Sequence, residues 1–498
     1  MAAEVELKLA LAARSVAPLL RRLSHWAEPQ VEWLDNIYFD TAEGLLARHR
    51  MGLRLRRQAS GWVQTLKTAG AEAALSRRGE WEMPVRRRRG QPRLDLKALA
   101  DTPLADLLAR HPASELAAVF ETRFQRTRWE FDCEGARIEV ALDRGHVSAN
   151  ARRAPIRELE LELKSGPPSA LIALALRLAQ GSGRQQPLSL VPATESKAAR
   201  GYRLASNLPL APSKASAAAL GAGAVLDLPA DAALRQVAAG AAAVIAANER
   251  GLAESDDAEF VHQARVALRR WRSALRLLDR RDRFPVALTD ELRWLAGVLG
   301  AARDADVLAA AILPALLAGA VSPAAVKLKL QAQADAERQA ARQQLRVELA
   351  SPRYALLALG LLAWAHAPSK GKRAVERVAS PRLARQRQRL IALGEGLAAA
   401  PDELIHEARV RAKCLRYGIE LLGSGADAVA WDQALAQLQA ELGAAHDATV
   451  AGGWVEARRV PPALRAELLR ACRETKERHA LAAERVLASM AELRVFRL

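Results

Sequence analysis

The pattern of apolar and polar positions divides the chain into two parts with different periods. Up to about residue 205, short segments alternate between apolar and polar residues, which is the period of a half-buried β-strand. About eight such segments can be counted, and helical periodicity interrupts them near three ranges, 13–25, 94–111 and 168–180. Beyond about residue 225 the spacing becomes helical to the end. The sequence therefore predicts a multidomain α+β protein with these parts: a strand-rich domain at 1–205, a linker at 206–227 and an all-helical domain at 228–498.

The helical part contains an internal duplication. The segment FVHQARVALRRWRSALRLL at 260–278 matches LIHEARVRAKCLRYGIELL at 404–422. Further along, LAGVLGAARDADV at 295–307 matches LQAELGAAHDATV at 438–450, at nearly the same offset. Each copy shows the periodicity of about four helices, so we expect two duplicated four-helix bundles. Their approximate ranges are 228–367 and 376–490.

Charged residues recur at every second position in about six of the strand-like segments, so they share one face of each strand. For a single strand the simplest interpretation is a solvated face on a half-buried sheet. Repetition with both signs of charge favours a closed sheet whose charged faces turn inward. Close carboxylates repel one another unless a hard cation such as Mg²⁺ lies between them, and Lys and Arg suit phosphate oxygens. Together these groups are typical of phosphoryl transfer.

An ordered series of short motifs runs through this first part. They are ExExK at 4–8, YFDT at 38–41, LRLR at 53–56, TLK at 65–67, RxExE at 78–82, LDRG at 142–145, ELELELKSG at 158–166 and SKAARGYRL at 196–204. The set resembles the CYTH superfamily, also called triphosphate tunnel metalloenzymes. The resemblance implies a closed eight-stranded antiparallel β-barrel, or tunnel, with flanking helices. Members hydrolyse or cyclise triphosphates with Mg²⁺ or Mn²⁺.

The same resemblance assigns roles to individual residues. The implied metal ligands are Glu4, Glu6, Asp143, Glu160 and Glu162. The implied triphosphate-binding cations are Lys8, Arg54, Arg56, Lys67, Arg126 and Lys164. The implied catalytic group is Glu160, Glu162 and Lys197, with Lys197 near the attacked phosphorus, where it helps to position the water. Glu80 and Glu82 match acidic positions that line the tunnel.

In each copy of the duplicated helix a row of cations runs beside the apolar stripe, about 100° away around the helix. The usual interpretation of a cationic row is a solvated face. Here the row survives duplication, borders the apolar stripe and contains almost no acidic residues, which favours a binding surface. Two such rows facing each other would form a groove for a linear, dense anion. The residues are His262, Arg265, Arg269, Arg272 and Arg276, then His406, Arg409, Lys413 and Arg416.

The two HxxR helices and the two LGxxRD-like segments resemble the CHAD domain, over about 228–490. This resemblance implies that the helical part binds inorganic polyphosphate through the nine cationic residues, and it makes location on polyphosphate granules an expectation. Asp304 and Asp447 are expected to be structural partners of the arginines in the two rows.

Composition supports a polyanionic partner. Lys and Arg number 74 against 56 Asp and Glu, a net charge of +18, although a GC-rich genome would also favour Arg. The three cysteines, Cys133, Cys414 and Cys472, are not at metal-ligand spacing and indicate a reducing compartment. The N-terminal residues lack the basic start of a signal peptide, so we expect a cytoplasmic protein without membrane association. Nucleic acid is disfavoured, because only Trp271 and Tyr417 offer stacking surfaces on the cationic helices.

The sequence therefore predicts metal-dependent hydrolysis of inorganic triphosphate to pyrophosphate and phosphate, coupled to polyphosphate binding. Two other enzymatic functions stay open, namely nucleoside or thiamine triphosphate hydrolysis and adenylate cyclisation. A non-catalytic binding protein associated with polyphosphate granules is the third alternative. The metal preference, the preferred polyphosphate chain length and the oligomeric state are not determined by the sequence.

Overall fold

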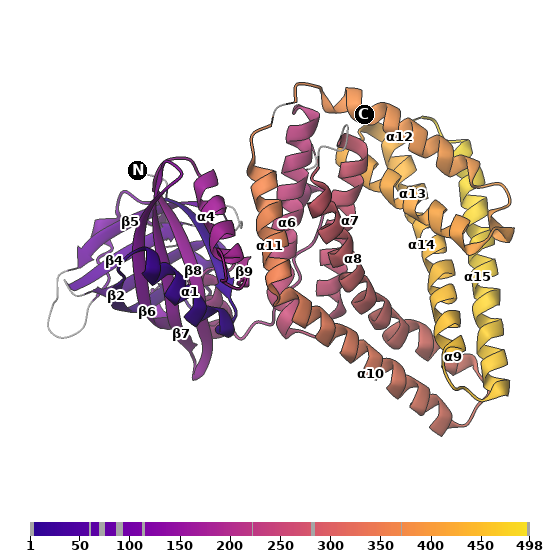
Figure 1. Ribbon diagram of the computed structural model, residues 1–498, viewed down its shortest axis with the longest axis horizontal. Helices are drawn as coiled ribbons and strands as arrows, with labels where there is room; N and C mark the ends of the chain where they lie inside the picture. The colour runs from indigo at the N-terminus through magenta and orange to yellow at the C-terminus, as the bar shows by residue number, and fades with distance from the viewer. Residues whose placement is uncertain are drawn as a thin grey trace. The chain divides into compact units, whose positions relative to one another are not determined.

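The structure is a computed structural model of the chain. It describes residues 4–58, 61–68, 75–85, 93–111, 115–221, 223–279, 284–369 and 371–495, although the side chains of Glu4 and of 75–78 lie outside this description. The chain divides into two compact units. The first is Met1–Ala211 with Leu349–Ala363, and the second is Pro212–Glu348 with Trp364–Leu498. Figure 1 shows the elements of both units.

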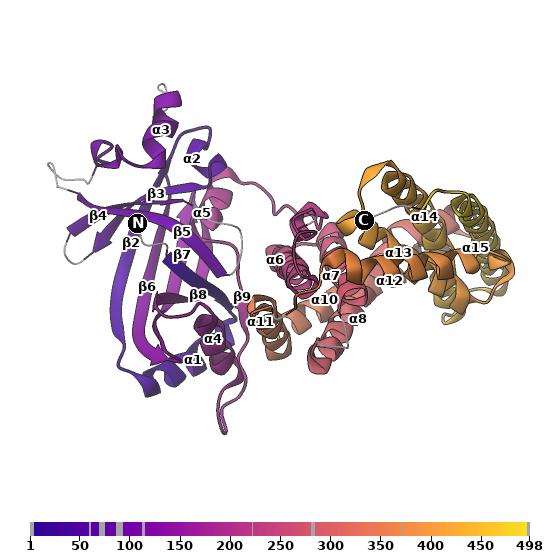
Figure 2. The ribbon, with the colours of Figure 1, turned by 90° about the horizontal axis from the view of Figure 1, so that it is seen from above.

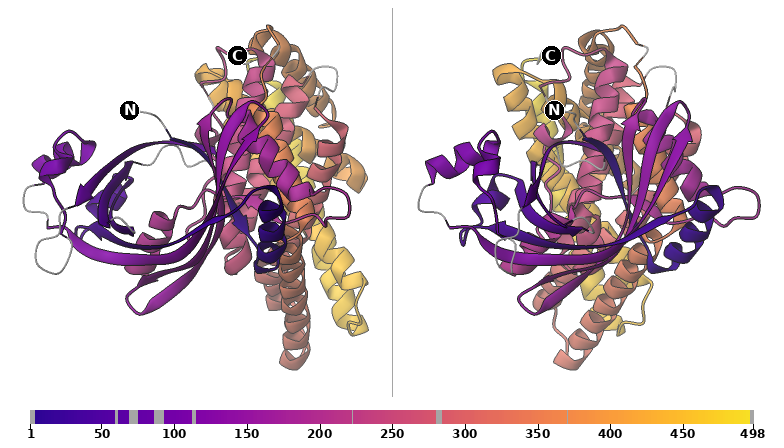
Figure 3. Two further views of the ribbon diagram at one scale, coloured as in Figure 1. Left: turned by 60° about the vertical axis from the view of Figure 1, so that its left-hand side comes forward. Right: turned by 90° about the vertical axis from the view of Figure 1, so that its left-hand side faces the viewer.

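An antiparallel sheet forms the first unit. Its strands are β1 (Glu4–Leu11), β2 (Gln30–Asp40), β3 (Met51–Gln58), β4 (Gly61–Thr68), β5 (Leu75–Val85), β6 (Ala117–Cys133), β7 (Ala136–Ala149), β8 (Arg152–Ser165) and β9 (Leu190–Pro192). Their order across the sheet is β5-β4-β3-β2-β6-β7-β8-β1-β9, and β5 also pairs with β1. The sheet is strongly curved, as both views of Figure 3 show.

The predicted eight-stranded closed barrel is confirmed only in part. The sheet has nine strands, because Leu190–Pro192 pairs with β1. The pairing of β1 with β5 covers four residue pairs, from Glu4↔Arg78 to Leu7↔Leu75, against six between β1 and β8. The structure thus establishes a curved antiparallel sheet rather than a fully closed barrel. A three-residue strand is too short to show the alternation on which the sequence prediction relied.

Helices cover one face of this sheet. Leu159 and Leu161 of β8 are fully buried against α1 (Ala13–Trp26) and α4 (Ser169–Gln180), together with apolar residues of β1 and β7. Figure 2 shows α1 and α4 next to each other beside the sheet, where the sequence predicted helices. Burial of each such leucine contributes about 1.5–3 kcal/mol. Because strand side chains alternate, the same packing turns the glutamates of β8 to the opposite, inner face.

Three further helices lie along the first unit, namely α2 (Leu45–Arg48), α3 (Pro103–Arg110) and α5 (Lys197–Ser206). The first two pack on β3 and β4 through a separate apolar cluster that includes Leu53 and Leu66. α5 contacts β6, β7 and β8. Its approach to β6 depends on Gly201, because a Cβ atom there would overlap the ring of Phe120. Close packing of α5 brings its first residue, Lys197, to the sheet.

From residue 230 onward the described chain is helical. The helices are α6 (Ala230–Glu254), α7 (Ala258–Leu278), α8 (Val286–Val307), α9 (Leu313–Gly319), α10 (Ala324–Leu349), α11 (Pro352–His366), α12 (Val375–Ala392), α13 (Asp402–Leu422), α14 (Gly425–Glu456) and α15 (Pro462–Ala491). The second sequence repeat has the four helices expected, with α14 and α15 as a long pair in Figure 1. The first repeat is divided further, because a π-helical turn at Leu308–Ile312 joins α8 to α9 and α10 and α11 follow.

By length and composition alone, α6 is apolar enough to cross a membrane. A long core helix of a folded domain meets the same criterion. The buried face of α6, which includes Val237 and Ala241, packs against α7, and buried Asn248 donates a hydrogen bond to the carbonyl of Ser213. These contacts are those of a core helix.

Replacing Gly201 with Ala should destabilise the first unit by about 1–3 kcal/mol, because the added methyl group must displace Phe120 or α5. The measurement is thermal unfolding of the full chain. Gly443→Ala is the matched control, since no atom lies within 4 Å of its added Cβ atom and Ala favours a helix by about 0.5–1 kcal/mol. An equal loss of stability in both variants would contradict this account of Gly201.

Candidate functional site

Carboxylates lie opposite one another where β1, β8 and β7 pair. Glu6 lies directly across from Glu162, which lies across from Glu139 on its other side. Opposed like charges are destabilising, and cations offset them here. The Nζ of Lys164 is 2.7 Å from Glu162 and 3.5 Å from Glu139, and the Nζ of Lys8 is 3.8 Å from Glu6. The inner face is therefore a region of balanced charge rather than an apolar interior.

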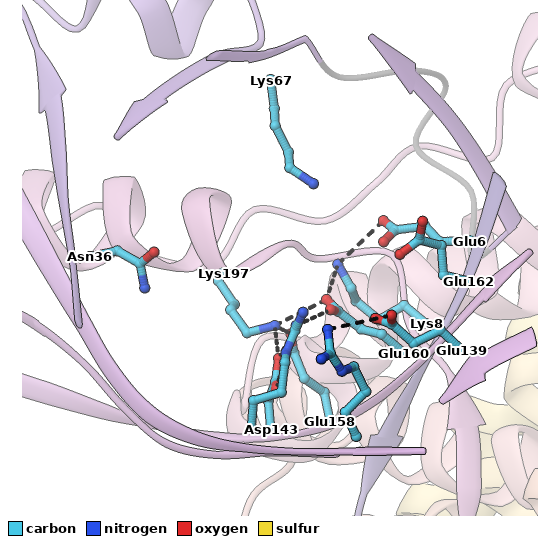
Figure 4. A network of polar contacts seen from close by, with 12 residues as sticks. Glu6, Lys8, Asn36, Lys67, Glu139, Asp143, Glu158, Glu160, Glu162 and Lys197 are labelled. Atoms are coloured by element: carbon cyan, nitrogen blue, oxygen red, sulfur yellow. Dashed lines mark hydrogen bonds and ion pairs between the residues drawn. The ribbon is translucent and has the colours of Figure 1, made fainter. Parts of the chain in front are cut away.

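A tighter cluster surrounds Lys197 at the start of α5. One carboxylate oxygen from each of Asp143, Glu158 and Glu160 lies within 4.8 Å of the other two. The Nζ of Lys197 is 2.7 Å from Asp143 Oδ2 and 3.0 Å from Glu160 Oε1, and it also contacts Glu158 Oε1 (Figure 4). Arg126 donates two hydrogen bonds to Asp143, at 2.8 and 2.7 Å, and one to Glu160 at 2.6 Å.

The carboxylate of Glu160 is held in the ionised state. Burial favours protonated Glu160, but the charges of Lys197, Lys8 and Arg126 outweigh that effect and hold its pKa well below the usual range. Burial also favours neutral Lys197, yet the charges of Asp143, Glu158 and Glu160 raise its pKa above the usual value. The group thus gathers carboxylate oxygens from three residues, and such donors fit a hard divalent cation such as Mg²⁺ or Mn²⁺.

Further cations come from β3 and β4. The Nζ of Lys67 lies 2.9 Å from Glu80, and Arg54 lies 3.8 Å from the same carboxylate. Arg56 differs, because its Nε donates to the amide oxygen of Asn36 at 3.0 Å, and that amide donates in turn to Thr122. Burial, together with the positive charges of nearby arginines, lowers the pKa of Arg56 to about 10. Glu82 and Tyr38 oppose this effect without cancelling it, so the surroundings of Arg56 favour an incoming anion.

The structure brings most of the predicted site residues together. Direct contacts join five of them, namely Lys8, Arg126, Asp143, Glu160 and Lys197. Three more lie further along the same strands, β1 and β8, namely Glu6, Glu162 and Lys164. The side chain of Glu4 lies outside the described residues. Glu82 is exposed and accepts a hydrogen bond from Thr65 at 3.2 Å.

Three residues of this region were not among the predicted site residues. Glu158 and Glu139 share the parity of their predicted neighbours in β8 and β7, so alternation was a signal for both. Asn36 carries no such signal, because a single buried amide in a strand has no characteristic spacing. Its role emerges only from its contact with Arg56.

In the second unit α7 and α13 pack together and place the two cationic rows against each other. Burial, reinforced by the charges of Arg409, Arg269 and Arg265, lowers the pKa of Lys413 to about 7. Asp447 opposes this effect on Lys413. The centre of the two rows is therefore a cluster of cations in which positive charge exceeds negative charge.

The other predicted contacts differ from this centre. Arg416 lies 3.0 Å from Asp432 and 3.3 Å from Glu420, so acidic residues do accompany the second row. Arg272 is half-buried beside Arg276, which is exposed. Burial lowers the pKa of His262, and exposed His406 lies 5.8 Å from the ring of His446.

The aspartates of the two LGxxRD-like segments act electrostatically on the central arginines. Burial lowers the pKa of Arg265, while the charge of Asp304 raises it. The charge of Asp447 acts on Arg409 in the same way. These aspartates partly offset the repulsion within the cluster.

A curved antiparallel sheet with a carboxylate–lysine cluster on its inner face, followed by duplicated helices, defines a two-domain class of protein. Residues 2–201 match the CYTH domain and residues 236–456 match the CHAD domain. The chain therefore carries a CYTH domain at its N-terminus followed by a CHAD domain, as the motifs predicted.

Among curated proteins, the chain is 34% identical over 209 residues to the inorganic triphosphatase of Haemophilus influenzae. The match covers 41% of this chain and 56% of that protein, so the chain spans about half the length of its curated relative. Among solved structures, the CHAD domain from Ricinus communis is 32% identical, with a TM-score of 0.48, over 58% of this chain and all of that one. PptA from Streptomyces chartreusis is 20% identical, with a TM-score of 0.43, over 53% and 99% of the two chains.

Replacing Lys197 with Met should lower the stability at pH 7 by about 3 kcal/mol, because it leaves buried carboxylates without their shared cation. The stabilisation from Glu160, whose pKa is depressed in the folded state, is present above its unfolded pKa of about 4.3 and is lost as the pH falls through the folded value. In the variant the pKa of Glu160 rises, because the charge of Lys197 no longer lowers it, so the loss of stability should shrink towards pH 4. Denaturant unfolding at both pH values measures this.

The control is Lys67→Met, whose half-buried ammonium pairs with Glu80 and should contribute below about 1 kcal/mol. A deficit for Lys197→Met that stays constant from pH 7 to pH 4 would contradict the assigned ionisation.

Proposed function

We propose that the first unit is a metal-dependent inorganic triphosphatase whose curved sheet works as a tunnel. The observation that carries this proposal is the convergence of buried Asp143 and partly buried Glu160 with Lys8, Arg126 and Lys197 on the inner face. The name of the Haemophilus influenzae relative supports inorganic triphosphate as the substrate. Triphosphate carries about four to five negative charges, which must be offset before water can approach it.

The acidic residues of the inner face are the proposed metal ligands. Asp143 and Glu160 would hold Mg²⁺ or Mn²⁺, with Glu6 and Glu162 in the adjacent row and Glu4 as a further candidate. The bound ion would supply Lewis-acid polarisation of phosphoryl oxygens.

The cationic residues bind the triphosphate and position it for attack by water. Arg54, Arg56 and Lys67 bind the phosphate chain, with Lys8, Arg126 and Lys164 as further contacts. Arg56 is suited to bind an anion, because its described hydrogen-bond partner is a neutral amide. Lys197 holds the terminal phosphoryl group in place for a water molecule that attacks in line, and pyrophosphate leaves.

The second unit would bind inorganic polyphosphate at the cluster formed by Arg265, Arg269, Arg409 and Lys413. Four neighbouring cations repel one another, and a linear polyanion removes that repulsion. His262, Arg272, Arg276, His406 and Arg416 would extend the contact along both helices. The same chemistry suits localisation on polyphosphate granules.

Glu160→Gln should reduce the rate of phosphate release from tripolyphosphate in the presence of Mg²⁺ or Mn²⁺ by at least about 100-fold, because it removes a charged ligand from the cluster. The control is Glu130→Gln on the same sheet, where the exposed carboxylate pairs with Arg137. A purified wild-type chain that binds tripolyphosphate but never hydrolyses it, with either metal, would exclude the enzymatic function. Product analysis with ATP separates cyclisation from hydrolysis.

Polyphosphate affinity should weaken about tenfold from pH 7 to pH 8.5, because Lys413 loses its proton in the free chain and must regain it in the complex. Arg stays charged throughout this range, so Lys413→Arg should remove most of the dependence. The pKa values of His262 and His446 are lowered, so both are neutral above pH 7. Titration calorimetry at fixed ionic strength measures the affinity.

A charge reversal in the cluster, Arg269→Glu, should abolish binding. Arg470→Glu, on the exposed face of α15, is the control and should bind as the wild type does. Equal losses in the two variants would indicate non-specific attraction to the net charge.

A further inference from the structure

Glu158 is a buried carboxylate to which the proposed reaction gives no role. Its exposed fraction is 2%, and it lies directly opposite Asp143 across the β7–β8 pairing. A buried charge at such a position requires compensating partners. Its two oxygens receive them separately. Oε1 contacts the Nζ of Lys197, and Oε2 lies 3.3 Å from the Nη2 of Arg200.

Both partners come from the first turn of α5. Lys197 and Arg200 are three residues apart, so they lie on the same face of the helix. Ser196 caps the helix by accepting a hydrogen bond from the Ala199 N–H at 3.1 Å. Arg200 also donates to the carbonyl of Pro155 on β8 at 2.8 Å. The start of α5 is therefore tied to β8 through Glu158, through the Pro155 carbonyl and through the contact of Lys197 with Glu160.

The neighbouring carboxylates also contact Lys197, but their further partners lie on other strands. Asp143 and Glu160 are both bound by Arg126 of β6, and Glu160 also lies 3.4 Å from Lys8 of β1. The described ionic partners of Glu158 both belong to α5. Its environment is thus that of a residue that holds the helix, although one of its oxygens lies near the other two carboxylates.

We infer that Glu158 is a positioning residue: together with Arg200 it fixes the ammonium group of Lys197 at the reaction centre, and it is not itself a metal ligand. This rests on the proposed function and deepens it. A lysine side chain has about 2 kcal/mol of rotamer entropy, and a misplacement of about 1 Å at a reacting centre lowers rates about 100-fold. Two bonds from Glu158, one to each cation, limit that freedom.

The test compares two isosteric changes in the full-length chain, Glu158→Gln and Glu160→Gln. Mn²⁺ binding is measured without substrate by electron paramagnetic resonance, and kcat and KM are measured with tripolyphosphate. Glu158→Gln should keep the Mn²⁺ dissociation constant within about twofold while kcat falls about 10–100-fold at nearly constant KM. Glu160→Gln should weaken Mn²⁺ binding at least about tenfold. Loss of Mn²⁺ binding in Glu158→Gln equal to that in Glu160→Gln would overturn the inference.

A second variant acts from outside the carboxylate cluster. Arg200→Met leaves all three carboxylates in place and should lower kcat in the same way as Glu158→Gln. The double variant should be no slower than the slower single variant, because both remove one interaction. Additive losses would show that the two residues act independently and would also overturn the inference. A wild-type chain without hydrolysis would refute the proposed function alone, since the Mn²⁺ comparison does not need turnover.

Discussion

The ionic network around Lys197 is the interaction on which the first unit depends. Removing several charges from water costs several kcal/mol for each ion unless partners replace the lost hydration. Here every carboxylate of the cluster has at least one cation, and Arg126 and Lys197 each join more than one carboxylate. The network can exist only if β6, β7, β8 and α5 are in correct register, because its members come from all four elements. The proposed binding surface and a constraint on the fold are therefore the same set of side chains.

In the second unit the charges of the central cluster are not balanced. At the centre of α7 and α13, cations gather with fewer acidic neighbours, and the aspartates that act on them offset only part of the repulsion. Such an arrangement is less stable than a balanced one, and the missing stabilisation is available to an anion that binds there. Further along, Arg416 pairs with Asp432 and Glu420, so this part of the row offers less to a ligand. The excess charge is therefore concentrated at the middle of the two rows.

The sequence predicted which face of a strand a residue occupies better than it predicted which residues of neighbouring strands lie opposite each other. Alternation in ELELELK was sufficient to place Leu159 and Leu161 in the core and the glutamates on the inner face. It was not sufficient to determine which glutamate meets Asp143, because that depends on the β7–β8 pairing, whose register shifts between Arg137 and Ile138. Glu158 occupies that position, and Glu160 lies across from Ala141. Asp432 was missed as a partner of Arg416 for a similar reason, since it reaches Arg416 through packing of α14 on α13. Glu420, the other partner, lies four residues further along the same helix, so helical spacing was a signal for it.

Lys197 and Lys413 show why residue type alone does not define chemistry. Burial favours the neutral form of both lysines. Three carboxylates reverse this for Lys197 and raise its pKa above the usual value, so its charge is permanent at any physiological pH. For Lys413, neighbouring arginines reinforce the preference of burial for the neutral form and lower the pKa to about 7. The charge of Lys413 therefore depends on what binds beside it. A polyanion at Lys413 would do what the carboxylates already do for Lys197, and the free energy of that protonation is part of the binding free energy. The neighbours that decide between the two outcomes come from other strands and helices, and only the folded chain brings them together.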